Sequence, residues 1–149
     1  MRQSVFSTTN LLCAACLMTA VLSSGCGRVA EKVALSDVCQ KEQNAVVNVE
    51  GFLRLPIVNN DDPSAPVYTL LLVERLNGTG NFLTTQVPAT DKNEPNRIGA
   101  LPASYTYKDF HVVTNNGKTA SSDDRVNVTG EVSKRDSGCV LKISKIETH

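Results

Sequence analysis

The sequence contains no tryptophan, and only 5% of its 149 residues are aromatic. Its apolar residues are mainly valine, leucine and isoleucine, and threonine, asparagine, aspartate and glycine are frequent between them. Such a composition favours β-strands separated by turns. The length allows one domain with a single hydrophobic core.

The chain also lacks a net charge, because 15 basic residues balance 15 acidic ones. Proteins that neutralise nucleic-acid phosphates carry an excess of Lys and Arg. Nucleic acid is therefore an unexpected partner. Five aromatic residues could still stack on bases: Tyr68, Phe82, Tyr105, Tyr107 and Phe110. Of these, Phe82 and Phe110 are predicted to belong to the core.

Sequence patterns of known active sites are missing as well. The chain has no Gly-x-Ser-x-Gly, no His-Glu-x-x-His and no glycine-rich phosphate loop. His111 lies between two apolar residues, which predicts the outward position of a strand, and His149 is the last residue. We therefore predict no catalytic residue and no enzymatic activity.

Metal and cofactor motifs are equally scarce. The one Cys-x-x-Cys, formed by Cys13 and Cys16, falls in the N-terminal segment considered next. The acidic pairs at residues 61–62 and 123–124 could offer oxygen ligands to calcium, but neither has EF-hand spacing. No metal site and no cofactor are predicted.

The N-terminus has the layout of an export signal. Residues 11–24 carry no charge and follow a short region that contains Arg2. The apolar run is too short for a permanent bilayer helix, which needs about 20 residues. A buried helix of a soluble domain would show a polar stripe, and this run shows none.

The end of this run, Leu22-Ser23-Ser24-Gly25-Cys26, resembles the lipobox of bacterial lipoprotein precursors. The resemblance implies that residues 1–25 are removed and that the Cys26 thiol takes a diacylglycerol. The protein would then be exported and lipid-anchored to a bacterial membrane, in the cell envelope or on the outer membrane facing the periplasm. Ser23 stands where the family most often has leucine. Cleavage after Gly25 by an ordinary signal peptidase would instead leave a soluble, secreted protein.

Five cysteines are present, and the predicted signal peptide and lipidation site assign three of them. Two leave with the signal and Cys26 takes the lipid, so Cys39 and Cys139 remain. Disulfides form and persist in exported proteins, which predicts that these two are bonded. Two free thiols are the alternative.

Residues 26–44 are predicted to combine the lipid attachment site with a flexible tether of at most one or two helical turns. Fully extended, that tether could hold the domain up to about 60 Å from the bilayer. Residues 45–149 are predicted to form a single β-domain. Its expected strands cover residues 45–55, 67–75, 81–87, 104–114, 125–132 and 139–147.

Several of these strands carry distinctive signals. Gly51 predicts a bend in the first strand, and Ile146 is out of phase with Leu141 and Ile143, which predicts a bulge near Ser144. Residues 67–75 are apolar on both faces and should form a central strand. Residues 56–66 and 88–102 are predicted to be loops, the second of them long and exposed.

The C-terminal pattern of residues 124–132, a turn and residues 139–147 resembles the last hairpin of an OB-fold. Val-Asn-Val-Glu-Gly-Phe-Leu, residues 47–53, is similar to that fold's bent first strand. The predicted class is all-β: a small Greek-key, OB-like barrel of five to six strands, with a β-sandwich as the alternative. The barrel would bring the start of its first strand near the start of its fifth, where Cys39 and Cys139 could meet. Residues 88–102 lack the apolar stripe that the family's middle helix would need.

These observations favour a membrane-anchored envelope lipoprotein that acts as a non-enzymatic binding or interaction module. Its partners would be the membrane, through the lipid, and an envelope protein or small ligand. That ligand would bind the barrel face or the loops at residues 56–66 and 88–103. The alternatives are an inhibitor or sensor lipoprotein of the envelope, or an enzyme without a recognisable site.

Overall fold

A computed structural model of the chain describes residues 29–57, 67–90, 92–99, 101, 106 and 109–148. The predicted signal peptide and Cys26 lie outside these residues. The long strands are β2 (Val46–Ile57), β3 (Val67–Val73), β4 (Phe82–Thr90), β8 (Arg125–Arg135) and β9 (Gly138–Thr148). The short elements are β1 (Glu31–Lys32), the 3-10 helix η1 (Leu35–Gln40), β5 (Arg97–Gly99), β6 (His111–Val113) and β7 (Thr119–Ser121). None of the helical structure in these ranges has the length and apolar character that crossing a bilayer requires.

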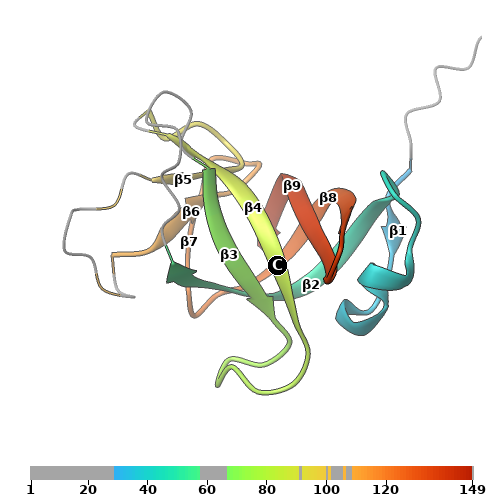
Figure 1. The fold of residues 1–149 in the computed structure, drawn as a ribbon. Helices are drawn as coiled ribbons and strands as arrows, with labels where there is room; N and C mark the ends of the chain where they lie inside the picture. The colour runs from blue at the N-terminus through green and yellow to red at the C-terminus, as the bar shows by residue number, and fades with distance from the viewer. Residues whose placement is uncertain are drawn as a thin grey trace, which may run out of the picture.

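The five long strands close into a barrel (Figure 1). Strand β2 pairs antiparallel with both β8 and β3, β3 pairs antiparallel with β4, and β8 pairs antiparallel with β9. The parallel pairing of β4 with β9 completes the circle. This is a Greek-key barrel of the OB-fold type. The all-β, OB-like prediction is confirmed, and the β-sandwich alternative is wrong because one sheet closes on itself.

Strand β2 bends where it changes partner. Residues 46–52 pair with β8 and residues 52–57 pair with β3, so Phe52 is shared by both ladders. A Cβ added at Gly51 would lie 2.7 Å from the backbone oxygen of Val73. Glycine is therefore required there by the close approach of β3, as the predicted bend implies.

The predicted bulge in the last strand is also present. Thr129 lies opposite Lys145 and Gly130 lies opposite Ile143, which leaves Ser144 as an extra residue in β9. The Ser144 hydroxyl donates to the backbone oxygen of Thr129 at 3.2 Å. The extra residue returns Ile146 to the core, where it is fully buried.

Strand β3 corrects one expectation. It is central, because β2 and β4 pair with its two edges. Its side chains nevertheless alternate: Tyr68, Leu70 and Leu72 are buried, whereas Val67 is 38% exposed. The two-sided burial predicted from its apolar run is wrong at Val67.

Residues 31–44, here called the N-terminal strap, correct the predicted flexible tether. Strand β1 pairs parallel with β2, and η1 contacts β2, β4, β8 and β9. Leu35 and Val38 are buried in the core cluster. The strap is thus part of the domain, because its apolar side chains close one end of the barrel.

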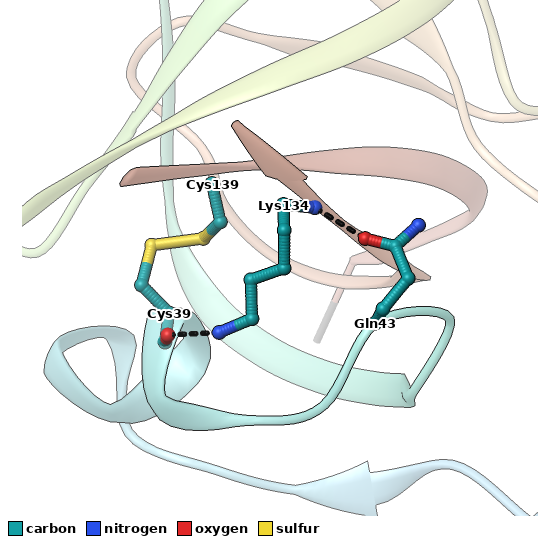
Figure 2. Close-up of a disulfide and its surroundings, with 4 residues drawn as sticks. All are labelled: Cys39, Gln43, Lys134 and Cys139. Atoms are coloured by element: carbon teal, nitrogen blue, oxygen red, sulfur yellow. Dashed lines mark hydrogen bonds between the residues drawn. A yellow bond between two sulfur atoms is a disulfide. The ribbon is translucent and has the colours of Figure 1, made fainter. Parts of the chain in front are cut away.

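A disulfide between Cys39 and Cys139, with a Cα separation of 5.4 Å, holds the strap on the barrel. Figure 2 shows Lys134 beside this bridge. Its side-chain amine donates to the backbone oxygen of Cys39, and its backbone N–H donates to the Gln43 side-chain oxygen at 2.6 Å. The predicted pairing of the two cysteines is confirmed.

A small sheet of β5, β6 and β7 lies between β4 and β8 in the chain and closes the other end of the barrel (Figure 1). Ile98, Phe110 and Val112 are buried in the core cluster. The predicted exposed loop at residues 88–102 is wrong in part, because β4 continues to Thr90 and β5 follows. Of the strand predicted over residues 104–114, the described residues 106 and 109–114 are in a strand only at β6.

Gly99 and His111 face each other within this small sheet. A Cβ at Gly99 would lie 2.1 Å from Nε2 of His111, so alanine there must displace the imidazole. We expect Gly99→Ala to lower the free energy of unfolding by about 1–2 kcal/mol. Adding His111→Ala should restore part of that loss in urea unfolding. A double variant whose loss is the simple sum of the two single losses would contradict this contact.

Candidate functional site

Three residues line up across the outer surface of the barrel at the start of β4. Phe52 of β2 lies opposite Val73 of β3, which in turn lies opposite Phe82 of β4. We call these three residues the apolar row. Val73 is only 4% exposed although the alternation of β3 points it outward, so neighbouring side chains cover it. Phe82 is 67% exposed, which leaves an aromatic ring available to a partner.

A crevice of about 340 Å³ adjoins this row, between the strap and the barrel. We call it the strap crevice. Its lining residues are Lys32, Val33, Ala34, Leu35, Ser36, Glu50, Glu74, Asn81 and Arg125. Asn81 precedes Phe82 and Glu74 follows Val73, so the row and the crevice are continuous. Their combined surface places an apolar wall beside a polar recess.

Arg125 joins the two parts. Its guanidinium carbon lies 5.8 Å from the centre of the Phe52 ring, within cation–π range. Its Nε lies 2.8 Å from Glu50 Oε1 in an ion pair. The ring and the carboxylate thus orient the guanidinium.

Glu74 is held in place on the other side of the crevice. Its Oε2 accepts hydrogen bonds from the backbone N–H and the side-chain amide of Asn81, both at 3.1 Å. Gly80, with φ of +93°, lets the chain turn closely past this carboxylate. Lys32 and Arg125 balance Glu50 and Glu74, so the crevice suits a neutral or zwitterionic group better than a polyanion.

The acidic pair at residues 123–124 is held by protein groups. The Ser121 backbone N–H and hydroxyl donate to Asp124 Oδ2 at 2.7 and 2.8 Å. Asp123 lies 3.5 Å from Arg54 in an ion pair. Over the described parts of the chain, no three His, Cys, Asp or Glu side chains gather closely enough to hold a metal ion.

The two hydrogen bonds from Ser121 lower the pKa of Asp124, the backbone N–H having the larger effect. A lowered pKa in the folded state stabilises the fold above the ordinary value of about 3.9, and this contribution disappears as the pH falls below it. We therefore expect Asp124→Ala to be destabilising at pH 7, with the deficit shrinking as the pH falls through the lowered pKa of Asp124, in chemical unfolding. Asp136→Ala, in an exposed turn, is the control. An Asp124→Ala deficit that is unchanged in acid would contradict the assignment.

The aromatic residues that could stack on bases differ in their exposure. Phe110 is buried, as predicted, and Tyr68 is also buried, so it offers no stacking face. The prediction that Phe82 belongs to the core is wrong. Leu83 and Val87 point inward, and the period of two therefore places Phe82 outside. Tyr105 and Tyr107 lie outside the described residues, as do residues 58–66 of the predicted loop.

No family model matches the chain, and a search of curated proteins found no match. Among solved structures, the hypothetical protein ygiW from E. coli is similar, with 12% identity over 80% of this chain and 91% of that one, at a TM-score of 0.47. The telomere capping protein Ten1 from S. pombe has 8% identity over 80% and 81%, at 0.41. The S. pombe Stn1–Ten1 complex has 10% identity over 82% and 78%, at 0.42. These likenesses assign no ligand, and the OB-type assignment stands on the strand pairing.

Proposed function

We propose that the protein is an exported, lipid-anchored, non-enzymatic binding module of a bacterial envelope. Its binding site is the apolar row together with the strap crevice. The observation that carries this proposal is the 67% exposure of Phe82 beside a covered Val73 and a charged crevice. An exposed aromatic ring beside a covered apolar neighbour is of the residue class in which protein interfaces are enriched.

The chemistry of the site indicates the kind of partner. Phe82 offers a flat apolar contact, Arg125 offers guanidinium N–H groups, and Glu74 offers a carboxylate. A protein segment that places a large apolar side chain beside charged groups of both signs would complement all three. We therefore propose an envelope protein as the partner.

Two features support export and anchoring. A disulfide that closes a 100-residue separation is typical of proteins that fold in an oxidising compartment. The lipobox-like sequence that ends at Cys26 supplies the lipid attachment.

The binding proposal is tested by crosslinking on intact cells that express the full-length protein. We expect one captured protein, with recovery reduced about tenfold or more by Phe82→Ala, which corresponds to the loss of about 1.4 kcal/mol or more of binding energy. Arg125→Gln should weaken capture as well. Leu76→Ala is the matched control, because Leu76 is also an exposed apolar residue, at 47%, but it lies on the hairpin and not in the row.

Phe82→Ala should change the free energy of unfolding by less than about 0.5 kcal/mol, since its side chain is mostly exposed. Loss of capture would then reflect binding and not folding. Capture that is unchanged by both Phe82→Ala and Arg125→Gln would show that the partner binds another surface of the protein. Failure to recover any partner, together with turnover of an envelope substrate by the pure protein, would contradict the binding-module proposal.

A further inference from the structure

We infer that the barrel end closed by the strap lies against the phospholipid headgroups of the membrane that holds Cys26, with the β5–β7 sheet directed away from it. This inference rests on the lipid anchor of the proposed function. The membrane-facing surface is the one around Val29 and residues 42–46, which shares no lining residue with the strap crevice. The inference follows from the length of free chain and from where that chain meets the barrel.

The free chain is short. The strap is folded onto the barrel from Glu31 onward, through β1, η1 and the disulfide. Only four residues lie between Cys26 and Glu31, and the five Cα-to-Cα steps span at most about 18 Å when fully extended. A flexible segment that extended to Asn44 would have allowed a distance of up to about 60 Å between the bilayer and the barrel. The barrel is therefore held within about one barrel diameter of the bilayer.

The anchor reaches the barrel at a defined end. Val29 shares a surface hollow with residues 42–46, at the start of β2. The β8–β9 hairpin lies at the same end, because the Asn44 N–H donates to the Val132 oxygen at 2.8 Å and Lys134 bonds to both Cys39 and Gln43 (Figure 2). This end is called the anchor end.

The small sheet marks the opposite end. The Asn115 N–H donates to the Ile146 oxygen at 2.6 Å, and the Ile146 N–H donates to Asn96 Oδ1 at 2.7 Å. Ile146 is eight residues along β9 from Gly138, which corresponds to about 26 Å of strand. Figure 1 places β1 and β5–β7 on opposite sides of the barrel.

The surface of the anchor end fits contact with headgroups and not insertion. Val29 is 92% exposed, and Lys134 and Arg135 are exposed at the hairpin. Lys41 is already paired with Glu31 at 2.6 Å. Lys134 and Arg135 can rest on phosphates, but Glu42 and Asp136 are exposed at the same end, so charge alone cannot bind a membrane without the lipid chain.

The test uses the full-length lipidated protein in vesicles whose headgroups carry a fluorescence quencher. A fluorescent non-canonical residue replaces either Arg135, at the anchor end, or Lys118, at the turn between β6 and β7. Both positions are exposed, so the two labels are matched. We expect the label at 135 to be quenched several-fold more strongly than the label at 118.

A Gly/Ser insertion of about 20 residues after Gly27 is the second variant, since such a linker spans about 25 Å on average and frees the barrel from the membrane. It should reduce quenching at 135 towards the value at 118. Equal quenching at the two positions without the insertion, or stronger quenching at 118, would overturn the orientation. Flotation of the vesicles is measured first: protein that fails to float with them shows that the lipid anchor itself is wrong, and with it this inference.

Discussion

Replacement of Cys139 by serine is expected to lower the free energy of unfolding by about 3–5 kcal/mol. The bridge to Cys39 spans 100 residues, so it removes much of the freedom of the unfolded chain. It also holds a strap that buries Leu35 and Val38 over the barrel end. An effect of this size is a large share of the stability of a small domain and should lower Tm by about 10–20 °C.

The measurement is chemical unfolding of the wild-type protein and Cys139→Ser, each with and without reductant. Reductant should bring the wild-type protein to the stability of the variant and leave the variant unchanged. Amide hydrogen exchange should rise first in residues 31–44, because those residues lose their covalent attachment. A reduced protein as stable as the oxidised one would contradict the role given to the strap.

Gly130→Ala is expected to be the most damaging change outside the disulfide, with a loss of about 2–4 kcal/mol. A Cβ at Gly130 would lie 2.5 Å from the backbone oxygen of Lys142 and 3.0 Å from Cγ of Leu141. The obstacle is backbone on the neighbouring strand, which cannot rotate away as the His111 ring can. The residue also lies beside the bulge at Ser144, where β8 and β9 change register.

Glu131→Ala provides the control, since it changes the adjacent residue of the same strand and should alter stability by less than about 0.5 kcal/mol. Denaturant unfolding of the two variants separates the contributions. Gly130→Ala with wild-type stability would show that β8 and β9 can separate without cost, contrary to the packing described above.

The barrel strands were predictable because each has one buried and one exposed face. Buried and less buried side chains alternate at residues 47–53 and 126–132, as predicted. The out-of-phase position of Ile146 correctly predicted the bulge near Ser144. Of the small sheet, β6 lies within the strand predicted over residues 104–114, but β5 and β7 were missed because three residues are too few for alternation to identify a strand.

The strap was missed for a different reason. Leu35 and Val38 stand three residues apart in a polar segment, which is the spacing of one 3-10 turn and too short to show a stripe. Cys39 was the available signal, since a disulfide on a segment fixes that segment to its partner. Half of the candidate site depends on this segment, so the strap crevice could not be predicted from the sequence.

The apolar row was only partly accessible to sequence reasoning. Leu83 and Val87 lie an even number of positions apart and point into the barrel, so Phe82 points to its outer surface. Phe82 was nevertheless predicted to be buried because large aromatic side chains are often part of the core. The alignment of Phe52, Val73 and Phe82 depends on the register of three strands. Register depends on the alternation of both strands and on the turn between them, so the alternation of one strand alone does not fix which residues lie opposite each other.

The proposed lipid attachment at Cys26 connects the proposals of export, of a short tether and of the orientation of the barrel. Mass spectrometry of the protein purified from bacterial membranes tests it most directly. We expect the N-terminal peptide to begin at Cys26, to lack residues 1–25 and to carry a diacylglycerol on that cysteine. An N-terminal peptide that retains residues 1–25, or one that begins at Cys26 without any lipid, would contradict it.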